Sequence, residues 1–115
     1  MFSKMENLIG MFQSKTFGTV LAIRATYEGP DGPTAVLLEA DGEALGVLSV
    51  NMYKPESSQD SKDLQKDCFY VKNWSENAQL AEDAAKSALF VLRADLPEAR
   101  SGFVSSPVWQ IVEGV

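Results

Sequence analysis

The sequence contains no histidine and a single cysteine, and both shortages restrict the chemistry it can perform. Histidine is the commonest general base and metal ligand, so its absence removes the usual partner of a catalytic nucleophile. Cys68 cannot form a disulfide within the chain, and a lone cysteine in a strand is more often a buried small side chain than a reactive thiol. The segment 29–32 is rich in glycine but lacks the lysine and helix of a phosphate-binding loop. We therefore expect a protein that binds without catalysis, and without a cofactor or metal.

Basic residues and long apolar runs are also scarce. Ten Lys and Arg residues face 16 Asp and Glu residues, for a net charge of −6. This negative field repels phosphate backbones, so direct nucleic-acid binding is not expected. No apolar run approaches the ~20 residues needed to cross a bilayer, and the N-terminal segment lacks the features of a signal peptide. We expect a cytoplasmic protein whose charge either serves solubility alone or complements a basic surface on a protein partner.

The composition is that of one folded unit. At 115 residues, 45% of them apolar, the chain has the usual size and hydrophobicity of one domain. We predict a single domain over 1–115, with a short helix in 1–13 and an α+β core in 14–115.

Apolar residues near the N-terminus have helical spacing. Met5, Leu8, Ile9 and Phe12 recur at i, i+3, i+4 and i+7, which predicts an amphipathic helix over 3–12. Because so short a helix is unstable alone in water, it should dock against another surface.

The rest of the chain predicts strands and one main helix. Alternating apolar residues and turn signals predict strands over 17–27, 34–40, 44–53, 68–73 and 103–112. Asp41-Gly42 joins two of these strands as a hairpin, and Pro107 places the last strand at an edge or bulge. The main helix should begin with Ser75 as its N-cap and bury a stripe from Leu80 to Leu89. Segment 89–92 fits either a continuation of this helix or a short strand. The order of elements indicates an α+β fold, with a mainly antiparallel sheet of about five strands and one helix packed on it.

The predicted hairpin is apolar on both faces. Val36 and Leu38 point to one side, whereas Ala35 and Leu37 point to the other. Strands of this kind are normally covered on both sides, and one helix covers only one. We therefore expect the uncovered part, together with the stripe at 5–12, to pack against another chain, most simply a second copy. Removing residues 1–13 should then weaken association before it unfolds the domain.

Acidic and aromatic residues supply the remaining candidates for partner binding. Asp41 and Glu43 lie at the hairpin tip, and Glu76 lies in the first turn of the main helix. Trp74, just before that helix, is either a core residue or a binding hot spot. The same two interpretations apply to Trp109 on the last strand. The full predicted partner-binding set is Met5, Leu8, Ile9, Phe12, Asp41, Glu43, Trp74 and Glu76.

The run Phe69-Tyr70-Val71-Lys72-Asn73-Trp74-Ser75-Glu76-Asn77 resembles the signature of a family of small bacterial proteins that carry a domain of unknown function. Members of this family are typically found on integrative and other mobile elements. The resemblance extends to 34–43, 48–51, 101–104 and 107–109, whereas the segment before Thr16 and the 55–67 loop depart from it. Small acidic non-catalytic proteins of mobile elements are often inhibitors of host defence, such as anti-CRISPR and anti-restriction proteins.

Two functional hypotheses follow. The first is an anti-CRISPR-like inhibitor that blocks a host nucleic-acid-handling defence complex sterically or electrostatically, through a subunit with a basic surface. The second is a self-associating accessory protein of the mobile element that has no defence target.

Overall fold

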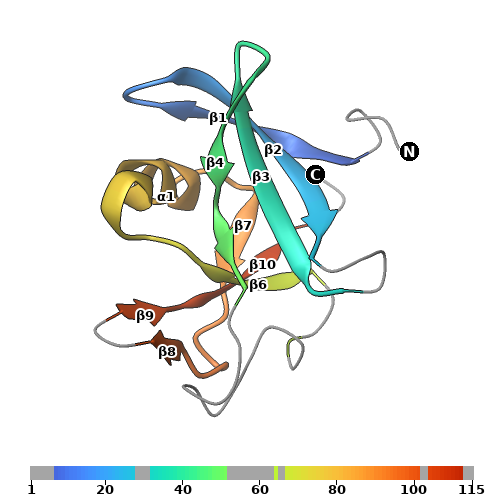
Figure 1. The fold of residues 1–115 in the computed structure, drawn as a ribbon, viewed down its shortest axis with the longest axis vertical. Helices are drawn as coiled ribbons and strands as arrows, with labels where there is room; N and C mark the ends of the chain where they lie inside the picture. The colour runs from blue at the N-terminus through green and yellow to red at the C-terminus, as the bar shows by residue number, and fades with distance from the viewer. Residues whose placement is uncertain (1–6, 28–31, 52–63, 65–66, 102–103, 113–115) are drawn as a thin grey trace.

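The computed structural model describes residues 7–27, 32–51, 64, 67–101 and 104–112, which form an α+β fold in which every strand pairing is antiparallel (Figure 1). The first sheet has the order β1-β2-β3-β4, with strands Leu8–Ser14, Gly18–Thr26, Thr34–Ala40 and Glu43–Val47. The second sheet has the order β5-β6-β10-β7, with strands Ser49–Val50, Cys68–Val71, Val108–Ile111 and Phe90–Leu92. A separate two-stranded ribbon pairs β8, Ala99–Ser101, with β9, Val104–Ser106.

The prediction of one five-stranded sheet is wrong because the chain changes sheets at Leu48. The predicted strand 44–53 is interrupted there, so that β4 belongs to the first sheet and β5 to the second. The Leu48 N–H donates to the Val36 carbonyl at 2.9 Å, and the Leu48 carbonyl accepts from the Lys72 N–H at 2.7 Å. One residue therefore bonds to both sheets. The predicted final strand 103–112 is likewise interrupted, because Pro107, which has no N–H for a sheet ladder, separates β9 from β10.

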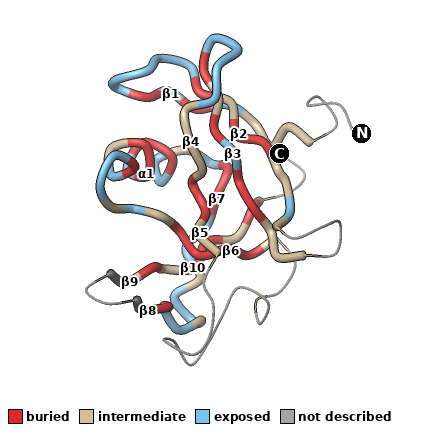
Figure 2. The backbone as a smooth tube through the Cα atoms, in the orientation of Figure 1, coloured by how far each residue is buried: buried red, intermediate tan, exposed pale blue. Residues whose placement is uncertain are grey.

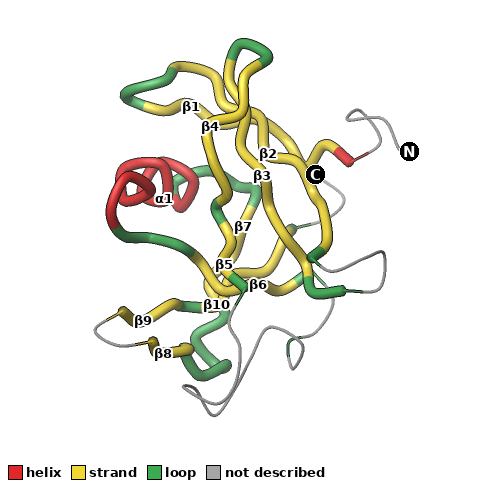
Figure 3. Tube along the Cα trace, viewed as in Figure 1, coloured by secondary structure: helices red, strands yellow, loops and turns green. Residues whose placement is uncertain are grey.

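The predicted N-terminal helix is also wrong, because Leu8–Ser14 form β1 (Figure 3). Phe12 is buried in the core, whereas Met11 on the opposite face of the strand is exposed. The register shifts between Leu8 and Gly10, and this bulge lets Ile9 pack against the core as well. Pairing with β2 and burial of Phe12 stabilise this segment as a strand, whereas so short a helix is unstable alone in water. Met5 and the predicted helix start lie outside the described residues. Since β1 is part of a sheet, removal of residues 1–13 takes out a structural strand and not a docking helix.

The main helix is shorter than predicted. A 3-10 turn, Ser75–Asn77, leads into α1, Ala78–Ala85. Ser75 has a φ of 56° and lies inside the 3-10 turn, so it is not the N-cap that its residue type indicated. The chain then turns over 86–89 and enters β7. Of the two structures that the sequence allowed for 89–92, a continued helix or a short strand, the strand is therefore the one that forms. Leu80, on the predicted stripe, is buried as expected. No helix among the described residues is long and apolar enough to span a membrane.

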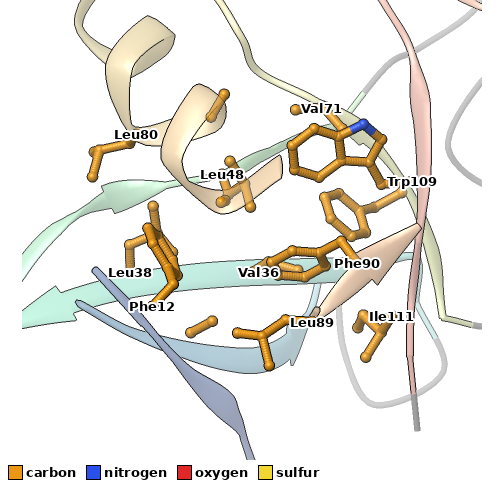
Figure 4. Packing of buried hydrophobic residues seen from close by; sticks show 14 of the residues in the cluster. Phe12, Val36, Leu38, Leu48, Val71, Leu80, Leu89, Phe90, Trp109 and Ile111 are labelled. Atoms are coloured by element: carbon orange, nitrogen blue, oxygen red, sulfur yellow. The ribbon is translucent and has the colours of Figure 1, made fainter. Parts of the chain in front are cut away.

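The main core lies between the two sheets and α1 (Figures 2 and 4). Three aromatic rings from the second sheet meet in it. The centroid of Phe69 lies 5.6 Å from that of Phe90 and 6.3 Å from that of Trp109, both in edge-to-face geometry. Such pairs add about 0.5–1.5 kcal/mol to the burial of their area. Trp109 is thus a core residue.

A smaller core covers the other face of the second sheet. It comprises Cys68, Tyr70, Ala99 and Val108, with Leu96 packed against it. The ribbon and the loop before it supply this second layer (Figure 1). The two-sided burial of the second sheet explains why all four residues of β6 are buried.

The apolar hairpin is covered unevenly on its two faces. Val36 and Leu38 face the main core and are completely buried. On the outer face Ala35 is buried, but the Leu37 residue is 37% exposed. Met11, on β1 of the same sheet, is 60% exposed. The expectation that another chain covers this outer face stays a prediction.

Gly10 allows Leu89 to pack against β1. A Cβ atom at position 10 would lie 2.4 Å from the Cδ2 of Leu89, which is shorter than van der Waals contact allows. We predict that Gly10→Val lowers the free energy of unfolding by about 1–3 kcal/mol through overpacking. Leu89→Ala alone should cost about 2–5 kcal/mol, because it leaves a cavity.

The double variant should cost clearly less than the sum of the two, since the new side chain then occupies space that Leu89 has left. Urea unfolding of the four proteins in this cycle measures the coupling. Additive costs would show that the two positions do not compete for the same space.

Candidate functional site

The β3–β4 hairpin ends in an exposed acidic turn. Asp41 and Gly42 have φ values of 54° and 80°, the left-handed conformation that two-residue hairpins require and that these residue types tolerate. Asp41, Gly42 and Glu43 are all exposed. We call these three residues the acidic tip. The turn is short and its strands are paired, so both carboxylates are held on a well-defined support.

The acidic tip carries two negative charges that form no ion pair with the cations of the described residues. Neither Asp41 nor Glu43 has an ion pair or a side-chain hydrogen bond within the described part of the chain. Some other carboxylates of the described residues are paired, in the salt bridges Arg24–Asp67, Lys72–Glu76 at 3.1 Å, Lys86–Glu82 at 3.4 Å and Arg93–Asp95 at 2.7 Å. The tip therefore presents two carboxylates that no described basic side chain neutralises by direct contact.

The β1–β2 turn lies at the same end of the first sheet as the acidic tip (Figure 1). Phe17 in this turn is 44% exposed, which is high for an aromatic side chain. Its ring provides apolar contact area at the end of the sheet that carries the two carboxylates. Phe17 was predicted only as a strand residue. Because it immediately precedes Gly18, which has a φ of 74°, it falls in the turn instead.

Asp83 ties this turn to α1. Its carboxylate is nearly buried, and it accepts hydrogen bonds from the Lys15 backbone N–H at 3.1 Å and from the Gln79 side chain at 3.0 Å. Burial disfavours the ionised form, but these bonds, with one from Ser14, outweigh it and hold the pKa of Asp83 below its ordinary value. The Asp83 carboxylate thus fixes the β1–β2 turn to the helix.

Trp74 and Glu76 do not join the acidic tip. The Asn77 side chain donates to the Val47 carbonyl at 2.6 Å, which places the 3-10 turn beside the far end of β4 from Glu43. Four residues of strand correspond to about 13 Å. Trp74 is half-buried, and Glu76 is ion-paired with Lys72. A backbone hydrogen bond, followed by the contacts with Lys72, lowers the pKa of Glu76.

The N-terminal apolar residues do not form a binding stripe. Phe12 is buried, Ile9 packs against the core and Leu8 is half-buried, so the shared helical face predicted for them does not exist. The exposed apolar side chains lie elsewhere, and sequence reasoning missed them. Met11 would have been found by reading 8–14 as a strand, because alternation places it opposite Phe12. In the described part of the chain the large exposed apolar residues are Met11, Phe17, Leu37, Val91 and Leu92.

Cys68 lies deep in the smaller core. Burial raises the pKa of its thiol, although the Arg93 guanidinium 3.8 Å away opposes this effect. A protonated, enclosed thiol is a poor nucleophile. No group of three or more metal-binding side chains occurs among the described residues. What the described surface offers is charge and apolar contact area.

Comparison of the chain with protein-family models, curated proteins and solved structures found no match. The resemblance of the segment 69–77 to a mobile-element family therefore stays a prediction.

The buried carboxylate of Asp83 gives a pH-dependent contribution to stability. Because its pKa in the folded protein is below the ordinary value, this contribution is complete above the ordinary pKa and is lost as pH falls through the folded pKa. We predict that Asp83→Asn lowers the urea midpoint at neutral pH. Its stability should also fall less than that of the wild type as the solution is acidified.

Glu82→Gln is the matched control, since Glu82 is exposed and its ion pair with Lys86 lies on the surface. Urea midpoints measured from neutral to acidic pH test this. Parallel curves for the wild type and Asp83→Asn would contradict the assignment.

Proposed function

We propose that this protein is a non-catalytic binding protein that docks its acidic tip on a basic surface of a partner protein. The observation that carries the proposal is that Asp41 and Glu43 are exposed on a paired hairpin and form no ion pair with the described residues. Opposite charges across an interface speed association and exclude wrong partners. The exposed Phe17 ring, at the same end of the sheet, supplies apolar contact that charge alone lacks.

The partner's basic surface is of the kind that otherwise holds nucleic-acid phosphates. A projecting pair of carboxylates competes for the same Lys and Arg side chains that neutralise phosphates. Occupation of such a surface inhibits the partner by excluding its nucleic acid. Together with the resemblance to mobile-element proteins, this supports an inhibitor of a host nucleic-acid-handling defence complex, similar in action to an anti-CRISPR protein.

Self-association as an accessory protein is the second candidate. It is supported by the exposed Met11 and Leu37 side chains on the outer face of the first sheet. Sedimentation at increasing protein concentration separates the two functions: a monomer that captures a basic partner fits the first, and a dimer that captures none fits the second.

The acidic tip is tested by removing its charge without changing its turn. We predict that Asp41→Asn with Glu43→Gln slows association with the captured partner about ten-fold at low salt, and much less at high salt, where charge is screened. Asparagine tolerates the left-handed conformation of position 41, so the fold should be kept. Reversal of both residues to lysine should slow association further.

The matched control is Glu76→Gln with Glu82→Gln, which changes the net charge equally but alters carboxylates already paired with Lys72 and Lys86. Partners are captured from host lysate on the immobilised protein, identified by mass spectrometry, and their association rates are measured by surface plasmon resonance. Equal slowing by both double variants would mean that overall charge acts, and not the tip.

A further inference from the structure

β7 is one of the two outer strands of the second sheet, and among the described strands it pairs along only one backbone edge. It pairs on one side with β10, and the flanking bonds from Arg93 N–H to the Val108 carbonyl and from Val112 N–H to the Leu89 carbonyl fix its orientation. In an antiparallel pair alternate residues direct their backbone groups to the same neighbour, so those of Val91 also face β10. Phe90 and Leu92 therefore direct their N–H and C=O groups away from it. Within the described residues these groups have no hydrogen-bond partner.

The side chains of β7 leave this edge accessible. Val91 is 46% exposed and Leu92 is 58% exposed, although both are apolar. Neither a charge nor a proline interrupts Phe90–Leu92, whereas proteins commonly use these devices to prevent edge pairing. Of the two edge strands of the first sheet, β1 and β4, the second differs from β7, because the Asn77 side chain donates a hydrogen bond to the Val47 carbonyl of β4.

The end of β7 is held rigid by a network around Arg93. Its guanidinium donates to both carboxylate oxygens of Asp95, at 2.9 and 2.7 Å, and to the Gln110 side chain at 2.9 Å. Gln110 lies on β10, so this network joins the exit of the edge strand to the strand behind it. The exposed edge is thus already ordered, and a ligand does not have to organise it.

We propose that the β7 edge binds an extended segment of a partner protein, which adds a strand to the second sheet. Two N–H and two C=O groups spaced two residues apart are matched by an extended backbone, and Val91 and Leu92 offer apolar contact on opposite faces of the new strand. The segment carries alternating apolar residues flanked by basic ones, because the protein has a net charge of −6.

A second copy of the chain fits this edge less well. Two copies would each bring a net charge of −6 to the interface. Pairing of two three-residue strands also buries far less than the roughly 1,200 Å² typical of a stable protein interface. A basic partner segment avoids the repulsion, and a segment longer than β7 can bury further area beyond the ends of the three-residue pairing. This site lies on the second sheet, and it does not depend on the acidic tip of the first.

The test uses a fluorescent peptide of alternating valine and threonine with lysines at both ends, and the same peptide with a central proline. Leu92→Pro removes one outward N–H, whereas Leu92→Thr removes the same apolar side chain and keeps that N–H. We expect the alternating peptide to bind the Leu92→Thr variant at least about ten-fold more tightly than Leu92→Pro, and the proline peptide to bind neither. Fluorescence anisotropy measures the binding, and equal affinity of the two variants would overturn the proposal.

Amide hydrogen exchange of the wild-type protein gives a second measurement that does not depend on the folding of Leu92→Pro. The peptide should slow exchange at Phe90 and Leu92 and leave Val91, already bonded to β10, unchanged. Unchanged exchange at Phe90 and Leu92 would overturn the proposal. Slow exchange in dilute protein without peptide would assign the edge to another segment of this chain. If exchange at Phe90 and Leu92 slowed with rising protein concentration in the absence of peptide, the β7 edge would be assigned to a second copy. Either of these last two results would contradict binding of a partner strand.

Discussion

The backbone of Leu48 is the junction on which both sheets depend. Its N–H bonds to Val36 of the first sheet, and its carbonyl accepts from Lys72 beside the second. Ser49, the next residue, is buried, and its hydroxyl accepts from the Val36 N–H at 3.0 Å and bonds with the Tyr27 hydroxyl at 2.8 Å. Because these polar groups are enclosed, any alternative path of the chain would leave several of them unsatisfied. The angle between the sheets, and the core that they enclose, follow from this junction.

Local sequence patterns predicted those elements whose structure is determined by residues close together in the sequence. The strand at 34–40 and the Asp41-Gly42 turn were predicted correctly, because alternation and turn chemistry act within a few residues. The same patterns did not predict that the strand after this turn would divide at Leu48. Its apolar residues suit a position in either sheet, and the partner that selects the break, Lys72, lies far along the chain.

The candidate site was predicted in part. Asp41 and Glu43 were identified from the hairpin signal, but the exposed Phe17 and the open β7 edge depend on tertiary contacts. The prediction of an N-terminal helix was wrong for a related reason. Leu8, Ile9 and Phe12 have helical spacing, but a bulge at Ile9 also lets Ile9 and Phe12 reach the core from a strand. Gly10, which weakens a helix, is the residue that β1 needs beneath Leu89.

The two sheets differ in how far apart along the chain their paired strands lie, and we expect this difference to set the order in which they form. The first sheet is a meander in which each strand pairs with the next one along the chain, whereas the second joins β6 to β10 and β10 to β7. Pairings between distant segments cost more chain entropy and form more slowly. During synthesis all strands of the first sheet are made before β10. The aromatic cluster of Phe69, Phe90 and Trp109 is therefore incomplete until β10, which carries Trp109, has been added. Pulsed amide labelling during refolding should show β2 and β3 protected ahead of β10.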